Sequence, residues 1–129
     1  MRKYHKDGSQ PKPDEIFVFG SNLSGIHGAG AAKQAITYGA QYGVGVGFMG
    51  NTYAIPTKDF KVDTLPLTNI AFFVKLFAQA SLNTPNMQYF VTAVGTGLAG
   101  YSHEQIAPLF ADCGDNCSFP DVWKQFLGD

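Results

Sequence analysis

Two glycine-rich segments have the residue types and spacing of loops that bind phosphate. The first covers residues 20–30, directly after the apolar run 16–19, and the second covers residues 95–102, directly after the run 89–94. A backbone without Cβ atoms brings its N–H groups close to an anion, and a helix that begins there adds the positive end of its dipole. Two such loops at the carboxyl ends of neighbouring strands would hold a diphosphate from both sides.

Four polar side chains in or near these segments are candidates for ligand contacts or catalysis. Asn22 would either contact a ligand or stabilise its own turn. Histidine titrates near neutral pH, so His27 would act as an acid, a base or a phosphate contact, unless it is an ordinary exposed loop residue. Lys58 and Asp59 follow the expected strand 52–55. Lys58 would neutralise phosphate charge and Asp59 would activate water or bind a ribose hydroxyl, unless the two form a solvated pair.

The elements that must position these residues alternate between strands and helices. Apolar runs predict strands at 16–19, 52–55 (ended by Pro56), 88–94 and 116–119, and helical spacing predicts helices at 31–39, 67–82, 102–113 and 121–127. The segment 43–50 has glycine at almost every other position and is either a flexible loop or an extended edge segment. This alternation predicts an α/β fold of three layers, α/β/α, with a largely parallel or mixed central sheet.

Length and composition limit the domain organisation and the functional class. The 129 residues, 45% hydrophobic and 15% charged, suit one folded domain, which we expect to span residues 15–129 after a flexible or loosely attached polar lead-in at 1–14. A net charge of −1 argues against broad nucleic-acid binding. Because the sequence shows neither a signal peptide nor a run that could span a membrane, we expect a soluble, cytoplasmic protein.

The cysteine and histidine content predicts no metal site. Cys113 and Cys117 are close in sequence, but the histidines at 5, 27 and 103 do not complete the spacing of a structural zinc site. We therefore expect two unpaired thiols near a helix–strand junction, and we predict neither a metal nor a cofactor.

Both glycine-rich segments resemble those of the macro domain, the α/β/α family that binds ADP-ribose. The pattern is carried by Phe19-Gly20-Ser21-Asn22, by His27-Gly28-Ala29-Gly30-Ala31-Ala32 and by Val94-Gly95-Thr96-Gly97-Leu98-Ala99-Gly100-Tyr101. The chain is also similar to a compact group of macro-like proteins of phages and bacteria that share the segments IFVFGSNLxGxHGAGAA, YAIPTKD and GLAGY. It departs from many macro domains by carrying His27 where they have another glycine. The glycine spacing of the first loop differs from that of dinucleotide oxidoreductases.

The resemblance implies that an ADP-ribose-like small molecule binds in a cleft at the strand ends. Asn22 would contact the distal ribose, and Tyr101 would lie beside the ribose or a base. In many macro domains an Asp in an extra strand pair at the front reads the adenine amine; here only a polar tail precedes Glu15, so the candidates for that role are Asp14 or Glu15. Backbone amides would hold the phosphates at Gly28, Ala29, Gly30 and Ala31 and at Gly95, Thr96, Gly97, Leu98, Ala99 and Gly100.

Two functional classes follow from this resemblance. The protein would be a hydrolase of an ADP-ribose derivative, in which His27 or Asp59 assists the attack of a water molecule near the distal ribose. Alternatively, it would be a non-catalytic binder that senses or sequesters a nucleotide signal, with a role in conflict between phage and host if the phage likeness holds. A positioned general base would separate the two classes.

Overall fold

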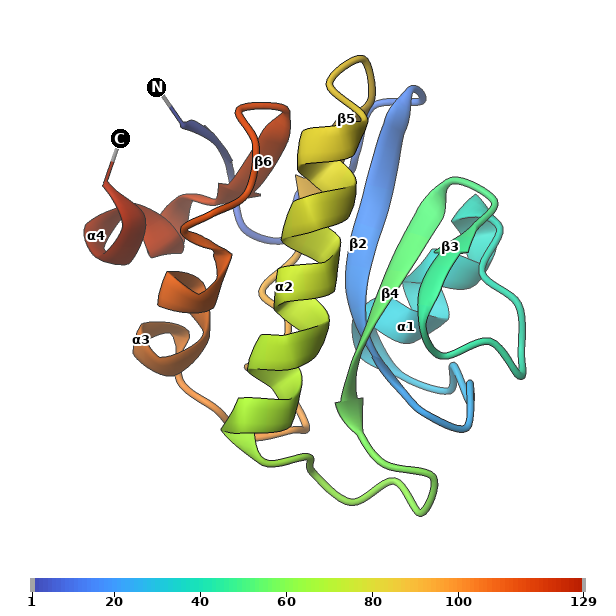
Figure 1. Ribbon diagram of the computed structural model, residues 1–129. Coiled ribbons are helices and arrows are strands. Elements are labelled where there is room, and N and C mark those ends of the chain that lie inside the picture. Colours follow the sequence, from blue (N-terminus) through green and yellow to red (C-terminus); the bar gives the residue numbers. More distant parts are fainter. Residues whose placement is uncertain (1, 129) are drawn as a thin grey trace.

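A six-stranded sheet forms the centre of the protein, for which a computed structural model describes residues 2–128 (Figure 1). The strands are β1 (Lys3–His5), β2 (Glu15–Asn22), β3 (Gly47–Met49), β4 (Thr52–Lys58), β5 (Gln88–Val91) and β6 (Cys117–Pro120). Their order across the sheet is β1-β6-β5-β2-β4-β3. All neighbouring strands are parallel except β3 and β4, which are antiparallel.

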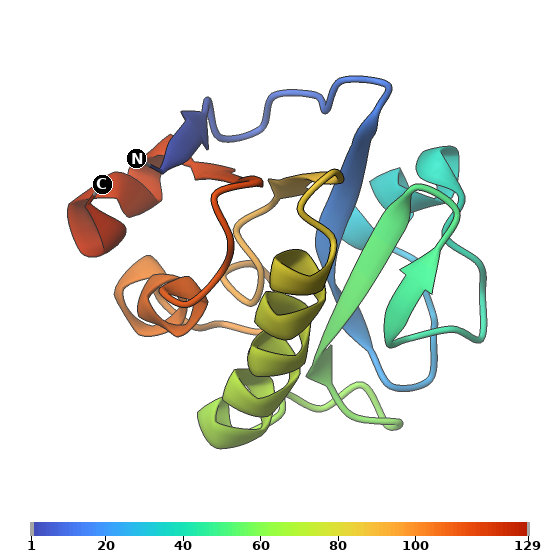
Figure 2. The same ribbon diagram turned by 45° about the horizontal axis from the view of Figure 1, so that its top comes forward.

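Helices cover both faces of this sheet (Figures 1 and 2). On one face lies α1 (Gly30–Ala35), which continues into a 3₁₀ turn at Ile36–Tyr38. The other face carries α2 (Leu67–Asn83), α3 (His103–Ile106) with a 3₁₀ turn at Ala107–Phe110, and α4 (Lys124–Leu127) after a 3₁₀ turn at Asp121–Trp123. This arrangement confirms the predicted α/β fold with a mixed, mostly parallel sheet.

The central strand β2 is buried on both faces, as its continuous apolar run predicts. Because side chains alternate along a strand, Phe17 and Phe19 pack in the cluster on the α1 side, whereas Ile16 and Val18 pack in the cluster that contains α2. Helix α2 contributes Ile70, Val74, Phe77 and Ala78 to that second cluster, in agreement with the helical spacing of its apolar residues.

Helix α3 begins as predicted and ends sooner. The Ser102 hydroxyl accepts a hydrogen bond from the Gln105 backbone, and the Gln105 side chain accepts one from the Ser102 backbone, so the two residues form a capping box. The α-helix expected to reach residue 113 gives way to a 3₁₀ turn after Ile106. Pro108 lies in that turn, and proline has no N–H group to donate to an α-helical hydrogen bond.

The structure corrects the ends of three predicted strands. The strand expected at 16–19 runs on to Asn22, so the first three residues of the first glycine-rich segment belong to β2. Strand β4 continues through Pro56 to Lys58, because its neighbour β3 pairs only with residues 52–54 and no partner there needs the missing N–H group. Strand β5 ends at Val91 and not at residue 94. Both the backbone N–H and the hydroxyl of Thr92 donate to the Val18 carbonyl, at 3.0 and 2.7 Å, where the chain leaves the sheet.

Two segments that the sequence left undecided or loosely attached contribute strands to the sheet edges. In the segment 43–50, residues 47–49 form the edge strand β3, which is the extended alternative. In the polar segment 1–14, residues 3–5 form β1, which pairs with β6 at the opposite edge. The Tyr4 hydroxyl also donates a hydrogen bond to the Gly128 carbonyl, so the first strand lies beside the end of α4.

The two cysteines are unpaired, and the helices are too short or too polar to span a membrane within the described residues. Cys113 lies between the 3₁₀ turn that ends at Phe110 and β6, and Cys117 is the first residue of β6; both are buried free thiols near a helix–strand junction, as predicted. A hydrogen bond to Cys117 and burial both raise the pKa of the Cys113 thiol. In the part of the chain that the structure describes, no helix is both long and apolar enough to cross a membrane.

Candidate ligand-binding cleft

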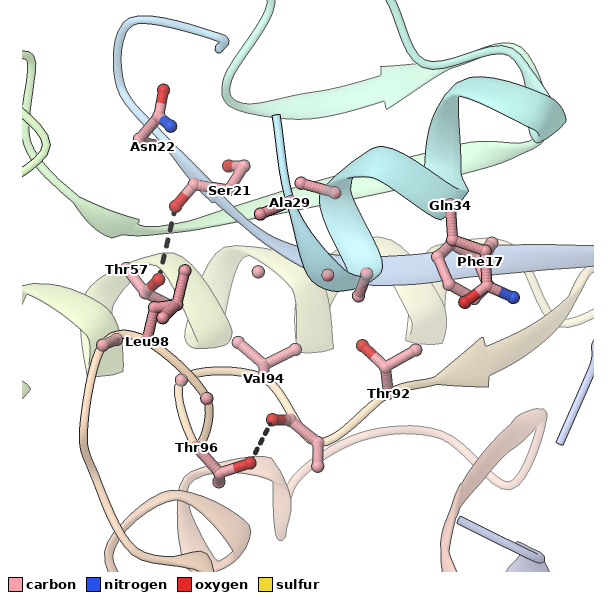
Figure 3. A pocket seen from close by; sticks show the side chains of 18 of the residues that line it. Phe17, Ser21, Asn22, Ala29, Gln34, Thr57, Thr92, Val94, Thr96 and Leu98 are labelled. Carbon is pink, nitrogen blue, oxygen red and sulfur yellow. Dashed lines mark hydrogen bonds between the residues drawn. The ribbon is translucent and has the colours of Figure 1, made fainter. Parts of the chain in front are cut away.

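The two glycine-rich loops face each other across one cleft at the carboxyl ends of β2, β4 and β5 (Figure 3). The cleft has a volume of about 530 Å³. Residues 28–31 of the first loop and 95–99 of the second line it, together with Thr57 and Lys58 of β4. The loops leave the sheet side by side, because a Cβ atom on Gly20 would lie 3.5 Å from the backbone nitrogen of Gly95.

Backbone N–H groups without acceptors border both sides of this cleft. Within the described residues, the hydrogen bonds leave the N–H groups of residues 28–32 in the first loop and of Gly95, Gly97, Leu98 and Ala99 in the second without a protein acceptor. Unpaired N–H groups in a concave backbone segment are the usual donors to phosphate oxygens. Helix α1 has only six residues, so these individual donors matter more here than a helix dipole.

Two glycines in the cleft are not required by the fold. Gly28 and Gly97 both have φ values that other residues adopt, and a Cβ atom on either would meet no atom within 4 Å. Neither backbone conformation nor protein packing therefore explains glycine at these positions. Close approach of a ligand to the backbone would explain it.

Asn22 lines the cleft, yet its side chain also stabilises the first loop. Its Oδ1 atom accepts hydrogen bonds from the Ser24 hydroxyl at 2.8 Å and from the Ile26 backbone N–H at 2.9 Å, and its Nδ2 atom donates to the Ile26 carbonyl at 2.8 Å. An amide side chain makes up to four hydrogen bonds, so one N–H of Asn22 is left for a ligand. The turn-stabilising role considered from the sequence is present in the structure.

His27 does not line the cleft. Its side chain is fully buried, with Nε2 2.8 Å from the Gln41 carbonyl oxygen and the ring edge-on to Phe19 at 5.4 Å. The Nδ1 atom is buried without a hydrogen-bond partner. The imidazole therefore packs between the first loop and the segment that follows α1, and this placement excludes the exposed-loop alternative.

Lys58 and Asp59 lie at the same end of β4, but only Lys58 lines the cleft. Lys58 lines the cleft, where an ammonium group would attract phosphate. Asp59 is not among the lining residues, and its Oδ1 atom accepts hydrogen bonds from the backbone N–H groups of Lys61 at 2.8 Å and Asp63 at 3.0 Å. The carboxylate thus holds the turn that follows β4.

The end of the second loop is tied to the segment between β4 and α2. Gly100 and Tyr101 do not line the cleft, unlike the residues just before them. The Tyr101 hydroxyl donates to the Leu65 carbonyl at 2.6 Å, and its backbone N–H donates to the Gly95 carbonyl at 3.0 Å. Tyr101 therefore fixes the shape of the loop in this structure.

The glycine-rich segment before β3 braces the first loop, a role that the sequence analysis missed. The Ser21 hydroxyl donates to the Gly45 carbonyl, and the Gly43 N–H donates to the Gly25 carbonyl at 3.0 Å. A Cβ atom on Gly45 would lie 2.0 Å from the Asn22 carbonyl oxygen, and one on Gly25 would lie 2.4 Å from the backbone of Gly43. The alternating glycines were the available signal, because two backbones this close leave no room for side chains.

Phe17 and Gln34 lie at one end of the cleft (Figure 3), and residues before β2 also line it. They are His5, Asp7, Gly8 and Ser9. The His5 ring stacks on Phe90 at 3.8 Å, and its Nδ1 atom lies 2.7 Å from the Ser118 hydroxyl. Burial lowers the pKa of His5, against the opposing charges of Glu15, Asp7 and Asp121.

Asp14 and Glu15 do not line this cleft. Both border a smaller pocket near the start of β2, which shares His5, Ser9 and Phe90 with the cleft. The Glu15 carboxylate accepts a hydrogen bond from the Lys12 backbone N–H at 2.7 Å. Asp7 is the acidic residue that lines the cleft, and its position in a polar segment without apolar periodicity gave no sequence signal.

Comparisons of the sequence with known proteins identify no relative, so any functional argument must rest on the fold and the cleft. No protein-family model matches the sequence, and no curated protein matches it. Within residues 2–128, no group of three or more His, Cys, Asp or Glu side chains is arranged to hold a metal ion. The structure therefore defines an α/β protein with a cleft bordered by two glycine-rich loops.

Proposed function

We propose that this protein binds ADP-ribose or a related nucleotide diphosphate in the cleft between its two glycine-rich loops. The observation that carries this proposal is the pair of facing backbone segments, 28–32 and 95–99, whose unpaired N–H groups border one cleft. A diphosphate has oxygens on both sides of its P–O–P bridge, so donors on both walls suit it better than a single phosphate. The resemblance to macro domains supports the same ligand.

The charge of the cleft supports a diphosphate that is held mainly by neutral donors. Lys58 supplies one positive charge and Asp7 one negative charge to the lining, and the unpaired donors that the two loops present are backbone N–H groups. Backbone donors in a partly enclosed site bind phosphate oxygens without the entropic cost of ordering long cationic side chains. A protein with net charge −1 can bind a small anion in this way while it does not attract nucleic acid in general.

The lining of the cleft near Phe17 suits the nucleoside part of the proposed ligand. Phe17 and Phe90, with ring centroids 6.2 Å apart, provide aromatic carbon there, and the Gln34 amide provides polar atoms; Asp7 is the acidic residue that lines the same cleft. A purine needs a flat apolar surface together with acceptors for its exocyclic amine. We assign the base to this end and the group beyond the diphosphate to the end near Asn22, Thr57 and Leu98 (Figure 3).

Binding without turnover is the form of this function that the site supports best. Of the two predicted general bases, His27 is fully buried and Asp59 is engaged by two backbone N–H groups, and neither lines the cleft. A general base must come within hydrogen-bond reach of the proton that it removes. We therefore favour a protein that senses or sequesters a nucleotide over a hydrolase.

Calorimetry tests the proposal directly. We expect saturable one-to-one binding of ADP-ribose and of ADP, and weaker binding of AMP, because AMP lacks the second phosphate that the facing loop would hold. Mass spectrometry of the recovered ADP-ribose should show no product. Equal affinities for AMP and ADP, or no binding of either, would rule out a diphosphate site.

A further inference from the structure

The segment between β4 and α2 joins the two glycine-rich loops at one end of the cleft. At its start, the Lys58 carbonyl accepts a hydrogen bond from the Leu23 N–H of the first loop at 2.9 Å. At its end, the Thr64 hydroxyl donates to the Ala99 carbonyl of the second loop at 3.1 Å. The hydrogen bond from Tyr101 to Leu65 adds a second connection to that loop. We call residues 58–65 the bridging segment; it forms the loop between β4 and α2 in Figure 1.

A tight turn inside the bridging segment places one valine in a strained conformation. The Asp59 carboxylate holds the turn through Lys61 and Asp63, and the Asp59 N–H donates to the Asp63 carbonyl at 2.8 Å. Val62 within this turn has a φ of 65° and is the only non-glycine residue with positive φ among those described. A β-branched side chain is strongly disfavoured in this region, which glycine or asparagine would occupy readily.

Val62 is one of three exposed large aliphatic side chains that line the cleft. Val62 is 42% exposed, Ile26 of the first loop is 53% exposed and Leu98 of the second loop is 80% exposed. They come from the three segments that the hydrogen bonds above tie together. Exposed apolar side chains that gather at one site, and do not scatter singly over the surface, indicate a contact with a ligand.

We propose that Val62 is a specificity-determining residue that contacts the group attached to the second phosphate of the ligand. With Ile26 and Leu98, it favours an uncharged substituent with a carbon-rich face, such as a pentose, over a third phosphate. This inference rests on the proposed function, because it assumes that a nucleoside diphosphate lies between the loops. It assigns the choice among such diphosphates to a side chain outside both glycine-rich loops.

The physical basis is the different cost of placing each group beside aliphatic carbon. The C–H face of a sugar gains stabilisation when it and the three side chains are removed from water together. A third phosphate would lose hydration beside the same side chains and gain no hydrogen bond from them, and Lys58 would be the one lysine or arginine in the cleft lining left to compensate it. Strained residues persist where the surrounding structure enforces them and are concentrated at ligand contacts, which accounts for valine at position 62.

The test compares the affinities of ADP, ADP-ribose and ATP for the wild-type protein and two alanine variants. Val62→Ala removes the contact, whereas Val46→Ala removes a valine of matched exposure, 43%, that does not line the cleft. We expect the wild type to prefer ADP-ribose over both ADP and ATP. Val62→Ala should weaken ADP-ribose binding about fivefold and leave ADP binding unchanged, as expected for the loss of part of one aliphatic contact. Val46→Ala should change neither affinity.

A second variant separates the contact from the strain. Val62→Gly removes both the side chain and its conformational cost, so its ADP-ribose affinity should fall as in Val62→Ala while its thermal midpoint does not fall. Equal weakening of ADP and ADP-ribose, or an unchanged preference for ADP-ribose in a variant that still binds ADP, would overturn the role of Val62 alone. Failure of the wild type to bind ADP would instead overturn the proposed function and this inference with it.

Discussion

Asn22 holds Ile26 through both ends of its side-chain amide. The Oδ1 atom accepts the Ile26 N–H at 2.9 Å while the Nδ2 atom donates to the Ile26 carbonyl at 2.8 Å, so the amide closes a ring around the turn 22–26. This turn leads directly into the unpaired N–H groups that begin at Gly28. The geometry of half of the proposed diphosphate site therefore depends on one side chain that also borders the cleft.

Replacing Asn22 with alanine should affect stability as well as binding. Asn22→Ala removes three hydrogen bonds and leaves the backbone groups of Ile26 without their partners, so we expect the free energy of unfolding to fall by about 1–3 kcal/mol. Affinity for ADP-ribose should fall at least tenfold. Urea denaturation and calorimetry would measure the two effects. Asn86→Ala, at an exposed position outside the cleft, is the control, and full stability of Asn22→Ala would contradict this structural role.

A negative charge at Gly97 should abolish binding without unfolding the protein. A Cβ atom at Gly97 would meet no atom within 4 Å and the residue is exposed, so Gly97→Glu should leave the thermal midpoint nearly unchanged. Its carboxylate would occupy the place proposed for the phosphate and repel the diphosphate. Gln79→Glu on the exposed side of α2 makes the same change of charge as a control. Normal ADP-ribose binding by Gly97→Glu would exclude this loop from the site.

Two substitutions of Asp59 separate a positioning role from a catalytic one. The Oδ1 atom of asparagine can still accept the N–H groups of Lys61 and Asp63, so Asp59→Asn should keep the turn and bind ADP-ribose normally. Asp59→Ala loses both acceptors, and we expect about 1–3 kcal/mol of destabilisation, measured by urea denaturation. If mass spectrometry shows hydrolysis by the wild type that Asp59→Asn abolishes while it retains binding, Asp59 is a general base after all.

His5 should make the protein less stable as the pH falls. Burial lowers the pKa of His5 below its ordinary value of 6.5, so in the window below 6.5 the unfolded chain takes up this proton before the folded protein does. Because the unfolded state then binds more protons, the free energy of unfolding decreases as the pH falls through that window. His5→Phe retains a ring against Phe90 but cannot titrate, so its loss of stability between about pH 7.5 and about pH 5.5 should be smaller. An equal loss in both proteins would show that other groups dominate.

The fold could be predicted where burial or capping leaves a local pattern. The run Ile16–Phe19 is continuous because β2 is covered on both faces, and Ser102 with Gln105 three residues later marks the start of α3. Strand β1 has no such pattern, because its three residues lie at a sheet edge and pair with a strand more than a hundred residues away. Its existence depends on a distant partner, which local periodicity does not record.

The backbone of the cleft could be predicted, but the directions of its side chains could not. Glycine runs after two strands correctly indicated two loops at one edge of the sheet. The burial of His27 depends on Gln41 and Tyr42. These two residues follow α1 in the chain and contact His27 in the first glycine-rich loop. The contacts of Tyr101 depend likewise on Leu65. Such long-range contacts decide whether a polar side chain faces a ligand or holds the protein together.

The order of strands in the sheet has a consequence for synthesis on the ribosome. The strands that carry the cleft loops, β2, β4 and β5, are complete by residue 91 and are direct neighbours. Strand β1 is made first, yet its partner β6 begins only at Cys117. The nascent chain can therefore pair the three strands that carry the cleft loops early, whereas β1 waits until β6 has been synthesised, and closing so long a loop is expected to be a late, slow event.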